Sequence, residues 1–188
     1  MFARVRGRFG RMLFGAETPL LDPSAATETD LAMMRRALDL ARPAAAHDEV
    51  PVGAVVYRTD TGEVLAEASN RRECDRDPAA HAELLAMRAA ARRLGDWRLT
   101  DCTVVVTLEP CAMCAGLVVN ARVGRLVFGA SDPKAGAVVS LYGLCADRRL
   151  NHRIEAIGGV LAAESSELLR EFFRNKRGRN ESNARDLP

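Results

Sequence analysis

Two short stretches constrain this chain more than any other feature, because each supplies part of one chemical site and the fold must bring them together. The first is His81-Ala82-Glu83, and the second is Pro110-Cys111-Ala112-Met113-Cys114. One imidazole and two thiols form a set of nitrogen and sulfur ligands that zinc prefers in a tetrahedron. We expect His81, Cys111 and Cys114 to hold one zinc ion and to leave its fourth position for water, as catalytic zinc sites do.

Glu83 lies two residues beyond the histidine and is not needed as a ligand. A carboxylate at that place can take a proton from the water and hand it to a leaving group. His-x-Glu followed by Pro-Cys-x-x-Cys is a known signature of zinc-dependent nucleobase deaminases, a class whose chemistry is already described. Cys-x-x-Cys alone would be weak, because redox motifs and structural zinc sites share it. The alternative is a structural site with a fourth ligand from elsewhere, or no metal at all.

Length and composition favour one globular domain with a substantial core. The chain has 188 residues, of which 48% are hydrophobic and 28% charged. No apolar run is long enough to cross a membrane, so we expect no membrane partner. The net charge of +2 is compatible with nucleic acid without arguing for it, because clusters of charge matter more than the total.

The cysteines indicate a reduced environment. Their number is odd and no convincing secretory signal precedes them, so a disulfide framework is not expected and the cytoplasm is the predicted location. The five are Cys74, Cys102, Cys111, Cys114 and Cys145. Cys102 opens an apolar run and is read as a core residue, whereas Cys74 and Cys145 have no motif around them.

Three segments differ in composition. Residues 1–26 form a basic extension in which four arginines precede any acidic residue. A transit peptide would be serine-rich, and this stretch has only Ser24. The extension is either a basic arm that touches RNA or, the favoured interpretation, a disordered segment. Residues 27–177 are the predicted deaminase domain, and residues 178–188 a polar tail, predicted to be disordered.

Periodicity and turn signals predict alternating strands and helices. A helix starting near Thr29-Asp30 has an apolar face and should kink or stop at Pro43. Strands are predicted at 50–57, 63–69, 102–108, 125–129 and 153–157, with a turn at 60–62. Polar loops are predicted at 70–76 and 132–143, and a closing helix at 161–176.

Both ligand stretches are predicted to open helices. Asp77 should cap a helix with Pro78 in its first position, ending at Gly95, and Pro110 should open another that runs to about Arg122. The two cysteines of the second stretch are three residues apart and so share a face at a helix N-terminus, where the backbone favours thiolate. Since helices and strands alternate after the first hairpin, we expect an α/β sandwich with parallel pairing in its second half.

At this level of detail the chain resembles the bacterial tRNA-specific adenosine deaminases over roughly residues 30–177. The resemblance rests on motifs beyond the ligand set. They are Val50-Pro51-Val52-Gly53-Ala54-Val55, Asp77-Pro78-x-Ala80-His81-Ala82-Glu83, Thr107-Leu108-Glu109-Pro110-Cys111-x-Met113-Cys114-Ala115-Gly116, Phe128-Gly129-Ala130, Asp132-x-Lys134-x-Gly136-Ala137, Leu150-Asn151-His152-Arg153 and Glu171-Phe172-Phe173-Arg174.

The resemblance implies a three-layer α/β/α cytidine deaminase-like sandwich with a central mixed five-stranded sheet. It implies a homodimer with one Zn²⁺ per subunit, and hydrolysis of the wobble adenosine in a tRNA anticodon stem-loop to inosine. Glu83 would shuttle protons and Asn70 would bond the purine edge. The substrate contacts that it implies are Asn70, Ala82, Lys134, Phe172, Phe173 and Arg174. Lys176 and Arg177 are further candidates for phosphate contact, although an ordinary solvated face explains such cations equally well.

Three features depart from the family pattern. Ser69 stands before Asn70 where relatives often carry a bulkier residue, Pro43 is unexpected in the first helix, and the N-terminal extension has no counterpart in short members. The first two matter less to the assignment, and the extension stays unassigned.

Rival activities share the fold. A cytidine deaminase usually has a Cys-Ala-Glu motif, with a third cysteine as a ligand, where this chain has His-Ala-Glu. The deaminase of riboflavin synthesis has a histidine and an insertion before its next cysteine, and the compact run from Pro110 to Cys114 lacks both. A guanine or other small-purine deaminase is the closest alternative, but Asp132-x-Lys134-x-Gly136 and Phe172-Phe173 favour the tRNA enzyme. A binding module without catalysis would not need the free carboxylate of Glu83.

Overall fold

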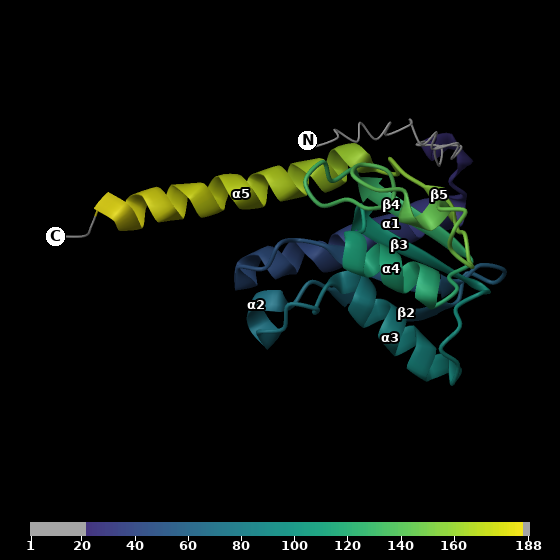
Figure 1. Cartoon of the computed structure of the whole chain (residues 1–188). Coiled ribbons are helices and arrows are strands. Elements are labelled where there is room, and N and C mark those ends of the chain that lie inside the picture. Colours follow the sequence, from purple (N-terminus) through teal and green to yellow (C-terminus); the bar gives the residue numbers. More distant parts are fainter. Residues whose placement is uncertain (1–21, 186–188) are drawn as a thin grey trace, which may run out of the picture.

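A computed structural model of the chain describes residues 22–185, with side chains described for residues 22–179. The chain forms a five-stranded sheet in the order β2-β1-β3-β4-β5 (Figure 1). The strands are β1 Gly53–Arg58, β2 Val64–Ser69, β3 Cys102–Leu108, β4 Arg125–Ala130 and β5 Glu155–Ile157. The α-helices are α1 Glu28–Ala44, α2 Arg72–Asp75, α3 Ala82–Leu94, α4 Ala112–Asn120 and α5 Ala162–Arg185. Residues 1–21 of the predicted basic extension lie outside the described residues.

The sheet is mixed, as predicted. β1 pairs antiparallel with both β2 and β3, whereas β3, β4 and β5 are parallel. The predicted turn at 60–62 joins β1 to β2, and Gly62 there has a φ of 73°, a left-handed conformation that glycine adopts at little steric cost. The order places β3 in the middle, so its carboxyl end opens onto the centre of one sheet edge.

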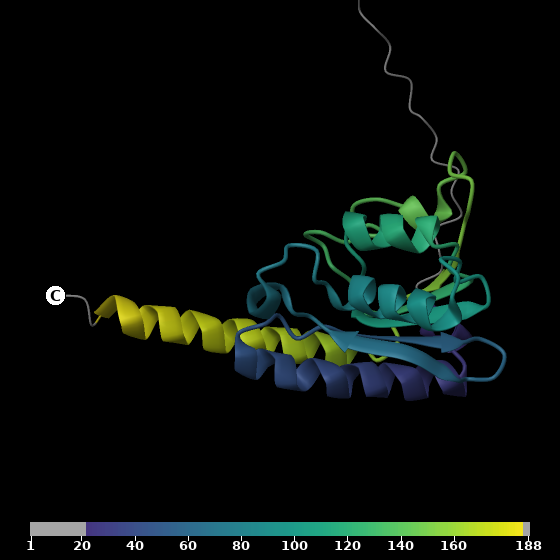
Figure 2. The same cartoon turned by 90° about the horizontal axis from the view of Figure 1, so that it is seen from below.

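Helices cover both faces of the sheet, which confirms the three-layer arrangement. α1 and α5 lie on one face, and α3 and α4 lie on the other (Figure 2). Alternate strand residues supply the two cores: Ala54 and Val56 belong to the core on the α3–α4 side, and Val55 and Tyr57 to the core on the α1 side. Period-two alternation therefore buries both faces of β1.

A buried polar cluster fixes α1 to the sheet at the edge opposite the parallel strands' carboxyl ends. Asp30 is fully buried and accepts hydrogen bonds from Tyr57 Oη at 2.6 Å and from Arg125 Nη1 at 2.7 Å. Burial alone would raise the pKa of the Asp30 carboxyl, but the bonds from Tyr57, Thr27 and Arg125 together lower it. Burial and the bond to Asp30 raise the pKa of Tyr57 to about 12.

The start of α1 corrects the predicted cap by two residues. Thr27 is the N-cap, and Asp30 at the third helical position completes a reciprocal capping box with it. The predicted stop at Pro43 is confirmed, because α1 ends at Ala44 and a 3₁₀ turn, Ala45–His47, follows. The chain then turns at Asp48, which has a φ of 60°.

The two helices that carry the ligand stretches begin later than predicted. Asp77 does not cap a helix; its side chain accepts from the backbone nitrogen of Ala79, and α3 begins only at Ala82. Pro110 likewise precedes α4, because its carbonyl accepts a hydrogen bond from Ala137 and holds the chain out of helical geometry. The predicted loop at 70–76 contains the short helix α2.

α5 extends well beyond its predicted end at residue 176 and runs to Arg185, projecting past the rest of the chain (Figure 1). Glycine at position 178 lies within the helix, where it costs only about 1 kcal/mol. Lys176 and Arg179 pair with Asp48 at 3.0 and 2.9 Å, which ties this part of the helix to the end of α1. None of the helices within residues 22–185 combines the length and the apolar character that a membrane span requires.

Candidate active site

The two ligand stretches meet at the N-termini of two helices on the same face of the sheet, as predicted. His81 is the N-cap residue of α3, and Cys111 is the N-cap residue of α4. Cys114 follows in the first turn of α4 and is fully buried. α4 follows directly on β3, so the central strand delivers its ligands to the edge of the sheet where parallel strands end.

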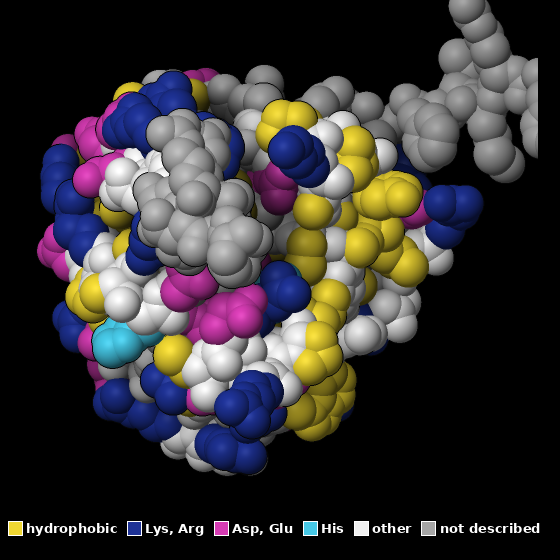
Figure 3. All heavy atoms as spheres, turned by 90° about the vertical axis from the view of Figure 1, so that its left-hand side faces the viewer, with side chains coloured by type: hydrophobic (Ala, Val, Ile, Leu, Met, Phe, Trp, Pro, Cys, Tyr) yellow, Lys and Arg dark blue, Asp and Glu magenta, His cyan; other side chains and the backbone are white. Residues whose placement is uncertain are grey.

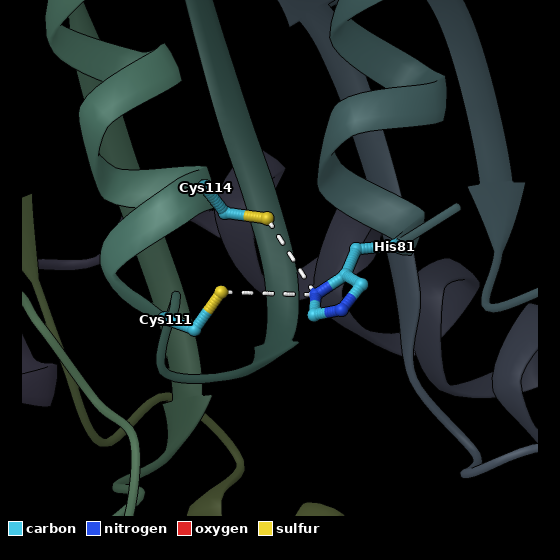
Figure 4. A group of neighbouring side chains, drawn as sticks. All are labelled: His81, Cys111 and Cys114. Atoms are coloured by element: carbon cyan, nitrogen blue, oxygen red, sulfur yellow. Dashed lines mark hydrogen bonds between the residues drawn. The ribbon is translucent and has the colours of Figure 1, made fainter. Parts of the chain in front are cut away.

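The three ligand atoms point toward one another (Figure 4). His81 Nδ1 lies 3.7 Å from Cys111 Sγ and 3.7 Å from Cys114 Sγ, and all three atoms lie within 4.8 Å of one another. Tetrahedral zinc, with bonds of about 2.3 Å to sulfur and about 2.1 Å to nitrogen, separates a nitrogen from a sulfur ligand by roughly 3.6 Å. The side chains therefore fit one zinc ion without rearrangement.

The two thiols differ in their affinity for a proton. Hydrogen bonds from Cys114 and His81 lower the pKa of Cys111 to about 3. Donation to Cys111 and burial raise the pKa of Cys114, and the hydrogen bond to Cys111 raises the pKa of His81. Cys111 is thus prepared as a thiolate, and Cys114 must release a proton when a cation binds.

Glu83 lies against this cluster from the first turn of α3. It is 4% exposed, and its negative charge helps to raise the pKa of the Cys114 thiol. Burial raises the pKa of the Glu83 carboxyl above its usual range, opposed by its own backbone N–H and by the charge of His81. A carboxyl with a raised pKa beside a metal-ligand set is suited to accept and return a proton.

Asn70 follows directly after β2 and is 6% exposed. Its backbone nitrogen donates to Val52 O at 2.9 Å, and its side-chain Nδ2 donates to Glu49 Oε2 at 3.3 Å. Sequence reasoning missed Glu49, which is almost completely buried. The only sequence signal for Glu49 was its position directly before the Val50-Pro51 motif. An acidic residue at such a position is easily taken for part of a solvent-exposed loop.

Glu109 is a second residue whose role the sequence did not reveal, although it lies within a motif that carries the resemblance. Its carboxylate accepts backbone hydrogen bonds from Asp132 at 3.0 Å and Val139 at 2.8 Å, and also from the Ser140 hydroxyl. Burial would raise the pKa of Glu109, but the bonds donated by Ser140 and its neighbours lower it. Glu109 thereby holds the 132–140 loop against Cys111, which forms an isolated β-bridge with Gly136.

The other predicted substrate contacts are distributed unevenly. Ala82 is fully buried with its methyl group in the core, so only its backbone could meet a substrate. Phe172 is also buried and packs edge-on against Phe173, which is 44% exposed. Lys134 is exposed on the loop that Glu109 holds, and Arg174 is exposed on α5, 3.6 Å from Glu167. Lys176, by contrast, is engaged with Asp48.

The fold and the site together define a deaminase of the cytidine deaminase-like type. A family model described as MafB19-like deaminase matches residues 28–177. The tRNA-specific adenosine deaminase of Haemophilus influenzae is 46% identical over 151 residues, which are 80% of this chain and 87% of that protein. The chain therefore belongs to the MafB19-like deaminases and, within them, to the family of the bacterial tRNA-specific adenosine deaminases.

Solved structures agree with this assignment. A chain from a study of A-to-I editing by deaminases at the wobble position of transfer RNA superposes with a TM-score of 0.69 at 40% identity, covering 73% of this chain and 99% of that one. A guanine deaminase from Nitrosomonas europaea superposes with a TM-score of 0.66 at 31% identity, covering 76% of this chain and 83% of that one. Fold similarity is thus nearly equal, and sequence identity separates the two activities.

Proposed function

We propose that this chain hydrolyses the wobble adenosine of a tRNA anticodon loop to inosine and ammonia. The observation that carries the proposal is the buried carboxylate of Glu83 against the triangle of His81, Cys111 and Cys114. The choice of substrate rests on similarity to the Haemophilus influenzae enzyme, which extends over four-fifths of the chain.

One zinc ion per subunit is part of the proposal. Nδ1 of His81 and the sulfurs of Cys111 and Cys114 would hold it. When bound, zinc supplies the Lewis acidity that makes water a nucleophile at neutral pH. Two of these ligands are sulfur and one is nitrogen. This donor set favours zinc, because magnesium and calcium prefer oxygen ligands.

Glu83 moves the protons in the proposed reaction. Its carboxylate accepts a proton from the attacking water as the oxygen adds to C6 of adenine, and returns it to N1 of the ring. It then accepts the second proton of the water and delivers it to the departing amine, which leaves as ammonia. The raised pKa of Glu83 suits both directions of transfer, and its burial keeps bulk water from competing.

An adenine can enter this site only when it is out of its stack. The anticodon loop is single-stranded, so splaying one base requires little energy there. Asn70 would bond the purine edge, the backbone at Ala82 would line the base pocket, and the exposed ring of Phe173 would stack on a flanking base. Lys134 and Arg174, both exposed, would contact phosphates.

We also propose that the chain forms a homodimer in the cytoplasm, with residues 27–177 as its deaminase domain. Figure 3 shows the face of the molecule that lies to the left in Figure 1. Hydrophobic side chains gather along the right-hand side of that view. Large apolar side chains are exposed at the start of α4 and in the segment packed beside it: Met113, Leu141, Tyr142 and Leu150. Such a patch on a protein surface is typical of an interface. The five cysteines are free thiols, which suits a reducing compartment.

A guanine deaminase is the second candidate, because the Nitrosomonas europaea guanine deaminase superposes nearly as well as the RNA-editing enzyme. It would use the same metal ligands and the same carboxylate. Its substrate, a free base, has no phosphates for the protein to contact. The two candidates therefore make opposite predictions for substrate choice and for salt dependence.

The test is a comparison of substrates with purified full-length protein. An anticodon stem-loop with a wobble adenosine, free guanine, cytidine and adenosine are incubated separately, and inosine and ammonia are assayed. We expect turnover of the stem-loop that declines as salt rises, because phosphate contacts release counterions. Rapid deamination of guanine, with no reaction of the stem-loop and no salt dependence, would reject the tRNA substrate and leave the deaminase chemistry in place.

A further inference from the structure

Glu49 is a buried carboxylate that the proposed reaction does not use. It is 1% exposed and lies between the 3₁₀ turn and β1. Among the described residues its hydrogen bonds come from two neutral donors: Asn70 Nδ2 reaches Oε2 at 3.3 Å, and the backbone nitrogen of Cys74 reaches Oε1 at 2.8 Å. Asp75 and, more weakly, Glu49 raise the pKa of the Arg71 guanidinium, but Arg71 pairs with Asp75, and within residues 22–179 no cation forms an ion pair with Glu49. Burying an acid without a direct ion pair is energetically expensive, so packing alone does not explain its presence.

The bond to Glu49 decides which way the Asn70 side chain faces. A carboxylate can only accept, so the Asn70 amide must turn its nitrogen toward Glu49 and its oxygen away from it. The opposite orientation fills the same space but exchanges the donor and the acceptor that the amide presents. Since the Asn70 backbone is already fixed by Val52 O, Glu49 selects between these two orientations.

The second oxygen of Glu49 extends this control toward the metal-ligand stretch. Cys74 belongs to α2, the short helix between Asn70 and His81. Beside it, the backbone nitrogen of Arg71 donates to Ala80 O at 3.0 Å, one residue before His81. One carboxylate therefore joins the amide that would read the base to the segment that leads into the metal-ligand set.

We propose that Glu49 is a positioning residue for the substrate base: it holds the Asn70 amide in one of its two orientations and fixes it relative to the segment that carries His81. This inference rests on the proposed function, because it requires Asn70 to contact a purine. Glu49 itself need not touch the substrate.

The test is a double-mutant cycle that combines Glu49→Gln with Asn70→Ala. Glutamine has the shape of glutamate, but it can accept from only one of the two donors, because its other end is an NH₂ group. In the otherwise unchanged chain we expect Glu49→Gln to lower kcat/KM for the stem-loop about tenfold or more. In the Asn70→Ala background the same change should alter kcat/KM by less than about twofold.

Asp30→Asn provides a matched control, since it removes an equally buried carboxylate at the opposite edge of the sheet. It should lower stability without coupling to Asn70→Ala. Zinc content and thermal unfolding are measured for each variant, so that a loss of metal or of fold is recognised. An equal loss of kcat/KM from Glu49→Gln in both backgrounds would overturn the proposal and leave Glu49 a structural residue.

A second measurement does not depend on the substrate. Side-chain amide protons of Asn70 should exchange slowly with solvent in the wild type, and much faster in Glu49→Gln, with the exposed Asn175 as the reference for a solvated amide. Exchange of the wild-type Asn70 amide as fast as that of Asn175 would refute the proposal. If guanine proves to be the substrate, the tRNA assignment fails, and the cycle is measured with guanine turnover, where the same coupling is expected.

Discussion

Replacing Glu83 by Gln separates chemistry from binding more cleanly than any other change. Glutamine keeps the size of the side chain in a site where Glu83 is only 4% exposed, so the packing of α3 should be preserved. The ligand set of His81, Cys111 and Cys114 is untouched, and we expect zinc and the stem-loop to bind as in the wild type. What is lost is the group that accepts and returns the proton.

The structure sets the size of the effect. A positioned acid–base group contributes about 10²- to 10⁴-fold to rate. Two other buried carboxylates lie near this edge of the sheet, and both are engaged: Glu49 accepts from Asn70 and Cys74, and Glu109 accepts from the 132–140 loop. Because neither is free to replace Glu83, turnover should fall by at least about a hundredfold and toward the upper part of that range.

The assay is single-turnover formation of inosine with enzyme in excess over the stem-loop, together with zinc analysis and RNA binding. Glu73→Gln serves as the control, because it removes an exposed glutamate from the neighbouring helix α2 and should leave turnover unchanged. Turnover of Glu83→Gln within a few-fold of the wild type would refute the assignment of Glu83 as the proton carrier.

Three further outcomes are expected. Cys111→Ala should lose both zinc and activity, and a full complement of zinc by elemental analysis would remove Cys111 from the ligand set. Asp30→Asn should lower the free energy of unfolding by about 3–5 kcal/mol at neutral pH, because it breaks a buried ion pair. The folded-state pKa of Asp30 is lowered, so the wild-type advantage should be present above pH about 4 and be lost as pH falls through that pKa; urea titrations in which the difference ignores pH would contradict this. Lys134→Ala and Arg174→Ala should each weaken stem-loop binding and reduce the salt slope of that binding by at most about one. Asn70→Ala should lower turnover and leave the slope unchanged. Fluorescence anisotropy across salt concentrations measures the slopes, and inosine formation measures turnover.

The parts of the fold that could be predicted are those marked by a local pattern of residue types in the sequence. Cys102–Leu108 is rich in β-branched residues, with three valines and two threonines, and it is the central strand of the sheet. His81, Cys111 and Cys114 were identified because a metal site restricts residue type and spacing together, and the structure brings them within bonding range of one ion. Predictions from such patterns hold because the tertiary contacts favour the same structure as the local sequence does.

The starts of the helices could not be predicted, because tertiary hydrogen bonds decide them. Proline at positions 78 and 110 favours a helix start, yet Ala80 O accepts from Arg71 and Pro110 O accepts from Ala137, which keeps both segments out of the helix. These non-helical segments are what carry His81 and Cys111 to the N-cap positions facing each other.

Glu49 and the end of α5 depended on contacts between residues far apart in the chain. Nothing local marks Glu49, whose partners Asn70 and Cys74 lie more than twenty positions away. The polar composition after residue 176 suggests disorder, but the pairs that Lys176 and Arg179 make with Asp48 bring the helix against the end of α1. Sequence periodicity contains no information on either contact.

The most direct test of the account is the identity of the nucleoside at the wobble position after incubation with the zinc-loaded chain. Two stem-loops are compared, one with its adenosine at the wobble position and one with it elsewhere in the anticodon loop, and each is digested and analysed by mass spectrometry. The account predicts inosine, with an equal amount of ammonia, from the first stem-loop and little or none from the second. Unchanged adenosine in both, from protein with a full complement of zinc, would contradict it.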